Sequence, residues 1–236
     1  GTRLLDENGL ELEQMVQKGS FGAALYNHAL TVINGDLSNS SAIDKLVEIH
    51  GTEVTFDPAA TTAAATYSRR RSDLDAETGF FFDIRDALLT AKAAIEAEGF
   101  DEERDQALED YLTAWEKSNF ATVIYYANAT KVALQEASGL EGADKDAKLG
   151  NALHAYAEGV AFANGFRGIT DKQITDAQID SILELLLAPN AGTPTSYRFL
   201  NEVSLLANLD SVISEIQTIY GFTDDEVQGF FVNNNP

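Results

Sequence analysis

The segment Lys148–Phe166, KLGNALHAYAEGVAFANGF, is strongly helical and places His154 and Glu158 four residues apart. Residues at this spacing share one face of a helix. A histidine and a carboxylate on one turn can share a metal ion, or the carboxylate can orient the imidazole. The chain has only three histidines, so this pair is the best candidate for chemistry. Alternatively, His154 is a half-buried residue whose hydrogen bonding is satisfied by Glu158. Both interpretations stay open.

Helical signals dominate the remainder of the chain, and no alternating run of β-branched and aromatic residues with hairpin turns predicts a sheet. Capping boxes at Thr175–Gln178 and Thr223–Glu226 indicate two helix starts. The stretch 51–79 is the predicted long loop or break, although its Ala/Thr run could be helical. We predict helices over Glu11–Asn34, Ser41–His50, Phe80–Ala97, Asp101–Leu134, Lys145–Phe166, Thr175–Leu187 and Tyr197–Tyr220, with a terminal helix from Thr223.

These amphipathic helices predict an all-α fold, an up-and-down helical bundle in which each helix buries one stripe. The chain is read as a single all-helical domain over 1–236, or as two fused bundles. The second version has sub-bundles 1–78 with part of 79–138, and 139–236. It is suggested by a short echo, because EIHGTEVTF around His50 and Glu53 resembles ALHAYAEGVAF around His154 and Glu158. Duplication and shared helix propensity explain this echo equally well.

Composition narrows the function classes. The chain carries 38 acidic and 16 basic residues, a net charge of −22, which disfavours nucleic acid and anionic membranes as partners. Cations are the more natural ligands, unless the charge serves only to solvate the surface. With no Cys there is no disulfide, thiolate nucleophile or Cys-type zinc site, so a metal would need His and carboxylate ligands.

No apolar run approaches the roughly 18 residues that span a bilayer. The chain begins at Gly1, close to the first predicted helix. We expect an export signal, or more of the domain, to precede it in the whole protein.

The sequence lacks two common motifs of hydrolytic enzymes. A zinc peptidase of the usual type has two histidines four residues apart beside a glutamate, and this chain has no such pair. It also has no Gly-x-Ser-x-Gly elbow for a serine nucleophile. The acidic stretch Ser72–Gly79 invites a calcium interpretation, but it lacks the turn glycine and the final glutamate of a calcium loop. We favour a polar loop that caps the next helix.

Charged and aromatic residues within helices admit structural and binding roles. Arg69–Arg71, the only basic run, is expected to pair with neighbouring carboxylates rather than to hold an anion. Trp115 and the Tyr125–Tyr126 pair have the spacing of core residues more than of a sugar-stacking surface. Lys18 and Glu116 lie in otherwise apolar helical segments, so each must be exposed or paired.

Several segments, taken in chain order from Gly9 to about Phe222, resemble the domain of unknown function 4856 family of exported bacterial proteins and lipoproteins. This family is related to the imelysin-like proteins. The resemblance is collective, because no single segment is a catalytic signature. The segments are GLELEQMVQKGSFGAALYNHA, TYSRRR, DALLTAKAAIEA, WEKSNFATVIYYANA, LGNALHAYAEGVAFANGF and ITDAQIDSILELL.

The resemblance implies an imelysin-like bundle in the periplasm or on the outer cell surface, lipid-anchored through a segment absent from this chain. It also implies a link to iron-responsive genes. Imelysins carry a Gly-x-His-x-x-Glu motif, of which His50 and Glu53 match the second part, with Ile49 before the histidine and no glycine two before it. His154 and Glu158 have a four-residue spacing instead. Glu11, Gln14 and Lys18 match the first helix of the family, and Trp115 and Glu116 its middle helix.

We therefore predict a non-enzymatic envelope protein that binds a ligand or partner, with iron or another divalent metal as the ligand the resemblance favours. A metallopeptidase and a structural surface protein are the alternatives. No other cofactor is predicted, and the expected partner is an envelope protein or a small cationic ligand. The candidate metal ligands are His154, Glu158, His50, Glu53 and Glu11, and the other candidate ligand-binding residues are Gln14, Lys18, Trp115 and Glu116.

Overall fold

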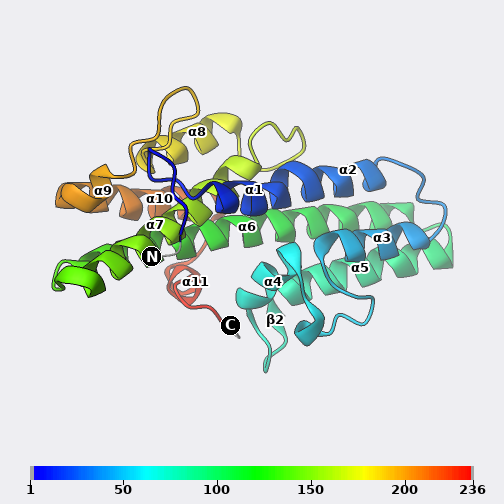
Figure 1. Cartoon of the computed structure of the whole chain (residues 1–236). Helices are drawn as coiled ribbons and strands as arrows, with labels where there is room; N and C mark the ends of the chain where they lie inside the picture. The colour runs from blue at the N-terminus through cyan, green and yellow to red at the C-terminus, as the bar shows by residue number, and fades with distance from the viewer. Residues whose placement is uncertain (1–2, 235–236) are drawn as a thin grey trace. The chain divides into compact units, whose positions relative to one another are not determined.

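The computed structural model describes residues 3–234 and confirms the all-α fold (Figure 1). Within these residues the only sheet is a two-stranded antiparallel hairpin that pairs Ser72 with Gly79. None of the described helices is long and apolar enough to cross a membrane. The elements are α1 (Leu12–Ser20), the π-helix η1 (Phe21–Tyr26), α2 (Asn27–Ile33), α3 (Ser41–His50), the 3-10 helix η2 (Pro58–Ala60), α4 (Ala63–Arg70), β1 (Ser72–Asp73), β2 (Thr78–Gly79), α5 (Phe80–Ala97), α6 (Asp101–Ala137), α7 (Gly142–Gly165), α8 (Asp176–Leu185), α9 (Arg198–Asn201), the 3-10 helix η3 (Val203–Leu205), α10 (Leu206–Tyr220) and α11 (Asp224–Phe230).

The chain forms two compact units. The α7 unit consists of residues 3–20, 120–168 and 174–232, and the α5 unit of residues 21–119, 169–173 and 233–234. The sub-bundles offered as an alternative, 1–78 with part of 79–138, and 139–236, follow the order of the chain, whereas each of these units gathers separate segments. Its boundaries at 20/21 and 119/120 lie inside helical stretches, where no turn residue marks them. Helix α6 therefore contributes its first half to one unit and its second half to the other.

The α7 unit is built on close packing of α1 against α7. A Cβ atom on Gly165 would lie 2.6 Å from the carbonyl oxygen of Gly19, so only glycine allows this backbone approach. Aromatic rings fill the core beside it, with Tyr126 stacked on Phe162 at 5.8 Å between centroids. The hydroxyl of Tyr156 donates to the carbonyl of Leu186 at 2.6 Å and ties α7 to the segment after α8.

The α5 unit gathers α3, α4 and α5 beside the first half of α6 (Figure 1). Its core holds Trp115, the only tryptophan, which confirms that residue as core. The indole meets Tyr26 edge-on at 5.4 Å and His50 at 4.7 Å between ring centroids. Phe81 is fully buried beside Phe56 at 6.1 Å.

Predictions from local signals are largely confirmed. Both capping boxes form, with the Thr175 hydroxyl accepting from the Gln178 amide and that of Thr223 from the Glu226 amide. Helix α5 has the predicted bounds, and the Ala/Thr run forms α4. Helix α3 also has the predicted bounds, and the side chain of Asn39 accepts the N–H of Ser41 at its start, at 2.8 Å.

Two long predicted helices are interrupted. Tyr197–Tyr220 breaks at Glu202, whose backbone (φ −118°, ψ 85°) leaves the helical region between α9 and η3. Apolar spacing hides this break, since Val203 continues the three-residue spacing of Leu206 and Leu209 and yet is exposed. In Glu11–Asn34 the segment η1 winds as a π-helix between α1 and α2.

Candidate functional site

Helix α1 buries its polar face. The apolar side chains of Leu12 and Val16 are exposed, whereas Gln14 and Lys18 are buried within the α7 unit together with Glu11, which precedes the helix. Positions 11, 14 and 18 fall on one face because they lie three and four residues apart. The matched first-helix residues of the sequence analysis therefore all point into the protein.

His154 of α7 lies between two carboxylates. Its Nδ1 is 2.6 Å from Oε2 of Glu11, and its Nε2 is 3.4 Å from Oε2 of Glu158. Lys18 places its ammonium nitrogen 3.5 Å from the other oxygen of Glu158, and Arg3 lies 3.7 Å from Glu11. The contact of His154 with Glu11 has hydrogen-bond geometry, whereas the contact with Glu158 is a longer one.

These five residues form a continuous series of polar contacts, which we call the α1–α7 network: Arg3, Glu11, His154, Glu158 and Lys18. The two carboxylates lie at different nitrogens of the ring, so they do not face a common point beside one nitrogen. Residues 3–234 hold no group of three or more His, Asp or Glu side chains arranged to bind a metal ion. The geometry is that of an ion-pair network fastening α1 to α7.

His50 and Glu53 do not come together. Helix α3 ends at His50, and Gly51 turns the chain away with a φ of 103°, so the second half of the echo is not helical. Glu53 is exposed, whereas His50 is fully buried with Nε2 3.2 Å from the Ser68 hydroxyl. Burial lowers the pKa of His50 to about 3. Its Nδ1 has no hydrogen-bond partner among the described residues.

Glu116 lies on the wall of a cleft in the α5 unit. Its side chain is buried, and one carboxylate oxygen accepts the backbone N–H of Gln173 at 2.8 Å. Of the two alternatives for Glu116 and Lys18, exposed or paired, both residues are therefore paired. Burial, followed by the nearby carboxylates of Glu116 and Asp171, raises the pKa of Tyr26 far above its usual range.

This cleft, which we call the α6 cleft, has a volume of about 620 Å³. Its lining combines four carboxylates, one ammonium group and several apolar side chains. Of the residues that line the cleft, only Glu116 is a candidate from the sequence. The 169–173 loop, which supplies Asp171 and Gln173, comes to lie beside α6 only in the folded chain. The lining residues are Tyr26, Ile33, Asn34, Leu37, Asp105, Leu108, Glu109, Leu112, Thr113, Glu116, Asp171, Lys172 and Gln173.

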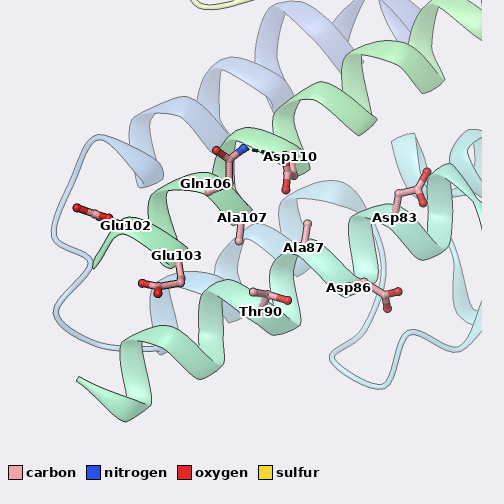
Figure 2. Close-up of a pocket in the computed structure, with 9 residues that line it drawn as sticks. All are labelled: Asp83, Asp86, Ala87, Thr90, Glu102, Glu103, Gln106, Ala107 and Asp110. Carbon is pink, nitrogen blue, oxygen red and sulfur yellow. Dashed lines mark hydrogen bonds between the residues drawn. The ribbon is translucent and has the colours of Figure 1, made fainter. Parts of the chain in front are cut away.

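A second groove, of about 710 Å³, runs between α5 and the start of α6 (Figure 2). Acidic side chains reach it from both helices, including Asp86 from α5 and Glu103 from α6. Gln106 donates to Asp110 at 3.0 Å along its α6 side, as the dashed line in Figure 2 shows. Most of its polar side chains are exposed, so this groove is a solvated acidic surface and a useful control for the α6 cleft.

The acidic stretch 72–79 and the basic run 69–71 make contacts of a structural kind. In the hairpin 72–79, one oxygen of Asp73 accepts the N–H groups of Asp75 and Ala76, both at 3.0 Å. The Ser72 hydroxyl accepts the amide of Phe81 and so caps α5, as a polar loop would. Among the basic residues, Arg70 lies over the Tyr67 ring and Arg71 donates to Asn233.

Comparison of the chain with known protein families, curated proteins and solved structures finds no match. The resemblance to exported imelysin-like proteins thus stays a prediction.

Proposed function

We propose that this chain is a non-enzymatic binding protein of the cell envelope and that its ligand is a cation held in the α6 cleft. The envelope location and the association with iron or another divalent metal are what the family resemblance implies. The observation that supports a cation as the ligand is the lining of the cleft. It contains the carboxylates of Glu116, Asp105, Glu109 and Asp171, but a single ammonium group, that of Lys172.

Electrostatics support this choice of ligand. The lining has an excess of negative charge, and its apolar walls focus the field of those carboxylates. The whole chain has a net charge of −22, which raises the local concentration of cations around it. The one lysine in the lining is held by its own loop, since its ammonium donates to the carbonyl of Ile169 at 2.5 Å.

The surroundings of the histidines support a binding rather than a catalytic role. Histidine is the usual general acid or base near neutral pH. His50 is fully buried beside Ser68 and Trp115, and His154 is engaged by Glu11 and Glu158. Neither lines the α6 cleft.

A structural surface protein without a ligand is the second candidate. The α1–α7 network favours it, because its charged groups already satisfy one another and connect the N-terminal segment to α7.

Equilibrium dialysis at constant ionic strength tests the proposal with Fe²⁺, Mn²⁺, Zn²⁺ and Cu²⁺ and with the triamine spermidine. We expect saturable binding of at least one cation by the parent and by His154→Ala, and weaker binding by Asp171→Asn and Glu116→Gln. Glu103→Gln is the matched control, because it removes the same charge from the groove of Figure 2. Glu116 is buried, so the exposed Asp171 is the decisive variant.

Absence of saturable binding for every cation would rule out the proposal and leave the structural candidate. Binding that is lost in His154→Ala but kept in Asp171→Asn would move the site to the α1–α7 network and disprove the cleft assignment.

A further inference from the structure

The carboxylates of the α6 cleft are spaced along one face of a helix. Asp105, Glu109 and Glu116 lie four and seven residues apart on α6 and all line the cleft. With a rise of 1.5 Å per residue, they are separated by about 6 Å and about 10 Å along the helix axis. Leu108 and Leu112 lie between them in the same lining. The wall therefore alternates negative charge with aliphatic surface.

This spacing does not suit a metal ion. Divalent cations bind several oxygen ligands at about 2.0 to 2.6 Å, which requires the carboxylates to meet at one point. Within residues 3–234 no group of three acidic or histidine side chains meets in that way. The volume of about 620 Å³ is instead that of a pocket for a small organic molecule.

The inner wall of the cleft is backed by buried aromatic side chains. Tyr26 lines the cleft and its ring meets Trp115 behind it. Tyr111 is fully buried nearby, its hydroxyl has no hydrogen-bond partner among the described residues, and its pKa is raised by burial and then by Tyr26. Tyr111 does not itself line the cleft, so its phenol belongs to the core of the α5 unit.

We infer that the ligand of the α6 cleft is a linear aliphatic polyamine, whose ammonium groups pair with the separated carboxylates while its methylene segments cover the leucines between them. This inference rests on the proposed cation-binding function and names its ligand class. Asp171 and the backbone of the 169–173 loop complete the polar lining at the end marked by Glu116.

Isothermal titration calorimetry of the full chain in 150 mM NaCl tests the inference with spermidine, butylamine and Mg²⁺. We expect one saturable spermidine site and at least tenfold weaker binding of butylamine, which has a single ammonium group. Glu109→Gln and Asp105→Asn should each weaken spermidine binding about fivefold, as expected for an exposed ion pair. Both positions are exposed, so these variants should keep the parent's thermal melting curve.

Glu103→Gln is the decisive control, since it removes one exposed charge from the same helix outside the α6 cleft. Its spermidine affinity should equal the parent's. Equal weakening by Glu103→Gln and Glu109→Gln would mean that spermidine follows overall charge, and would overturn the inference. Saturable binding of a divalent cation but not of spermidine would leave the cation-binding function standing and the polyamine wrong. No saturable binding of either would reject both.

Discussion

At the scale of single residues, His50 links burial to acid stability. Its ring is fully buried between the Ser68 hydroxyl and the Trp115 indole, and burial lowers its pKa from 6.5 to about 3. Above pH 6.5 the ring is neutral in both the folded and the unfolded chain. Between pH 6.5 and 3 the unfolded chain binds a proton that the folded chain does not, so stability falls as the pH falls through this window.

Replacing His50 should remove this dependence. One pKa unit corresponds to about 1.4 kcal/mol, so the parent should lose about 3 kcal/mol through His50 between pH 7 and pH 4.5. We expect the free energy of unfolding of His50→Gln to fall by about 3 kcal/mol less than that of the parent over the same interval. Urea unfolding followed by the fluorescence of Trp115, which contacts His50, measures it. His28→Gln is the control because His28 is exposed, and parallel losses in the parent and both variants would contradict the prediction.

Contacts between single residues that are far apart in the chain could not be predicted from the sequence. The spacing of His154 and Glu158 predicted their contact, which is present at 3.4 Å. The shorter contact of His154 is to Glu11, 143 residues away, and no helical periodicity relates the two. The α6 cleft was missed for the same reason, because Asp171 and Glu116 become neighbours only when the 169–173 loop folds beside α6.

At the scale of elements, the packing of α1 on α7 depends on glycine. A methyl group at position 165 would meet the carbonyl oxygen and Cα of Gly19 at 2.6 Å and 3.0 Å. Gly165→Ala should therefore destabilise the fold by about 1 to 3 kcal/mol, the usual cost of overpacking. Gly150→Ala in the same helix should stabilise it by up to about 1 kcal/mol, because a methyl group there meets nothing within 4 Å.

Thermal unfolding followed by circular dichroism separates these outcomes. A domain of this size shifts its Tm by about 2 to 4 °C per kcal/mol, so the two variants should move the Tm in opposite directions. An increase in both would show that helix propensity outweighs the close approach and would disprove the packing argument.

Elements also show why some boundaries are predictable. Each capping box is a local arrangement of four residues, and both formed as the sequence indicated. The polar face of α1 is buried for a non-local reason, since Lys18 lies beside the carboxylate of Glu158 and Glu11 beside the imidazole of His154, both on α7. Apolar periodicity alone would have pointed Leu12 inward, and it is exposed.

At the scale of the whole molecule, charge repulsion opposes folding. Even if each of the 16 Lys and Arg residues paired with one carboxylate, 22 of the 38 acidic side chains would remain uncompensated. The exposed ion pairs, such as Lys131 with Asp210, each contribute no more than about 1 kcal/mol. Salt weakens both the repulsion among the surplus carboxylates and the attraction within these pairs. Because the pairs contribute little, we expect the loss of repulsion to have the larger effect on stability.

Raising the salt concentration should consequently stabilise the protein. The Debye length falls from about 30 Å at 0.01 M to about 10 Å at 0.1 M, so most repulsion between distant carboxylates is screened over this range. We expect the Tm to rise by a few degrees at pH 7, equally in NaCl and in tetramethylammonium chloride, because screening depends on ionic strength. A fall would mean that ion pairs dominate, and a rise with only one cation would point to specific binding. The Asp171→Asn variant, measured in parallel, should follow the parent if screening is the cause and lose the effect if the cation occupies the α6 cleft.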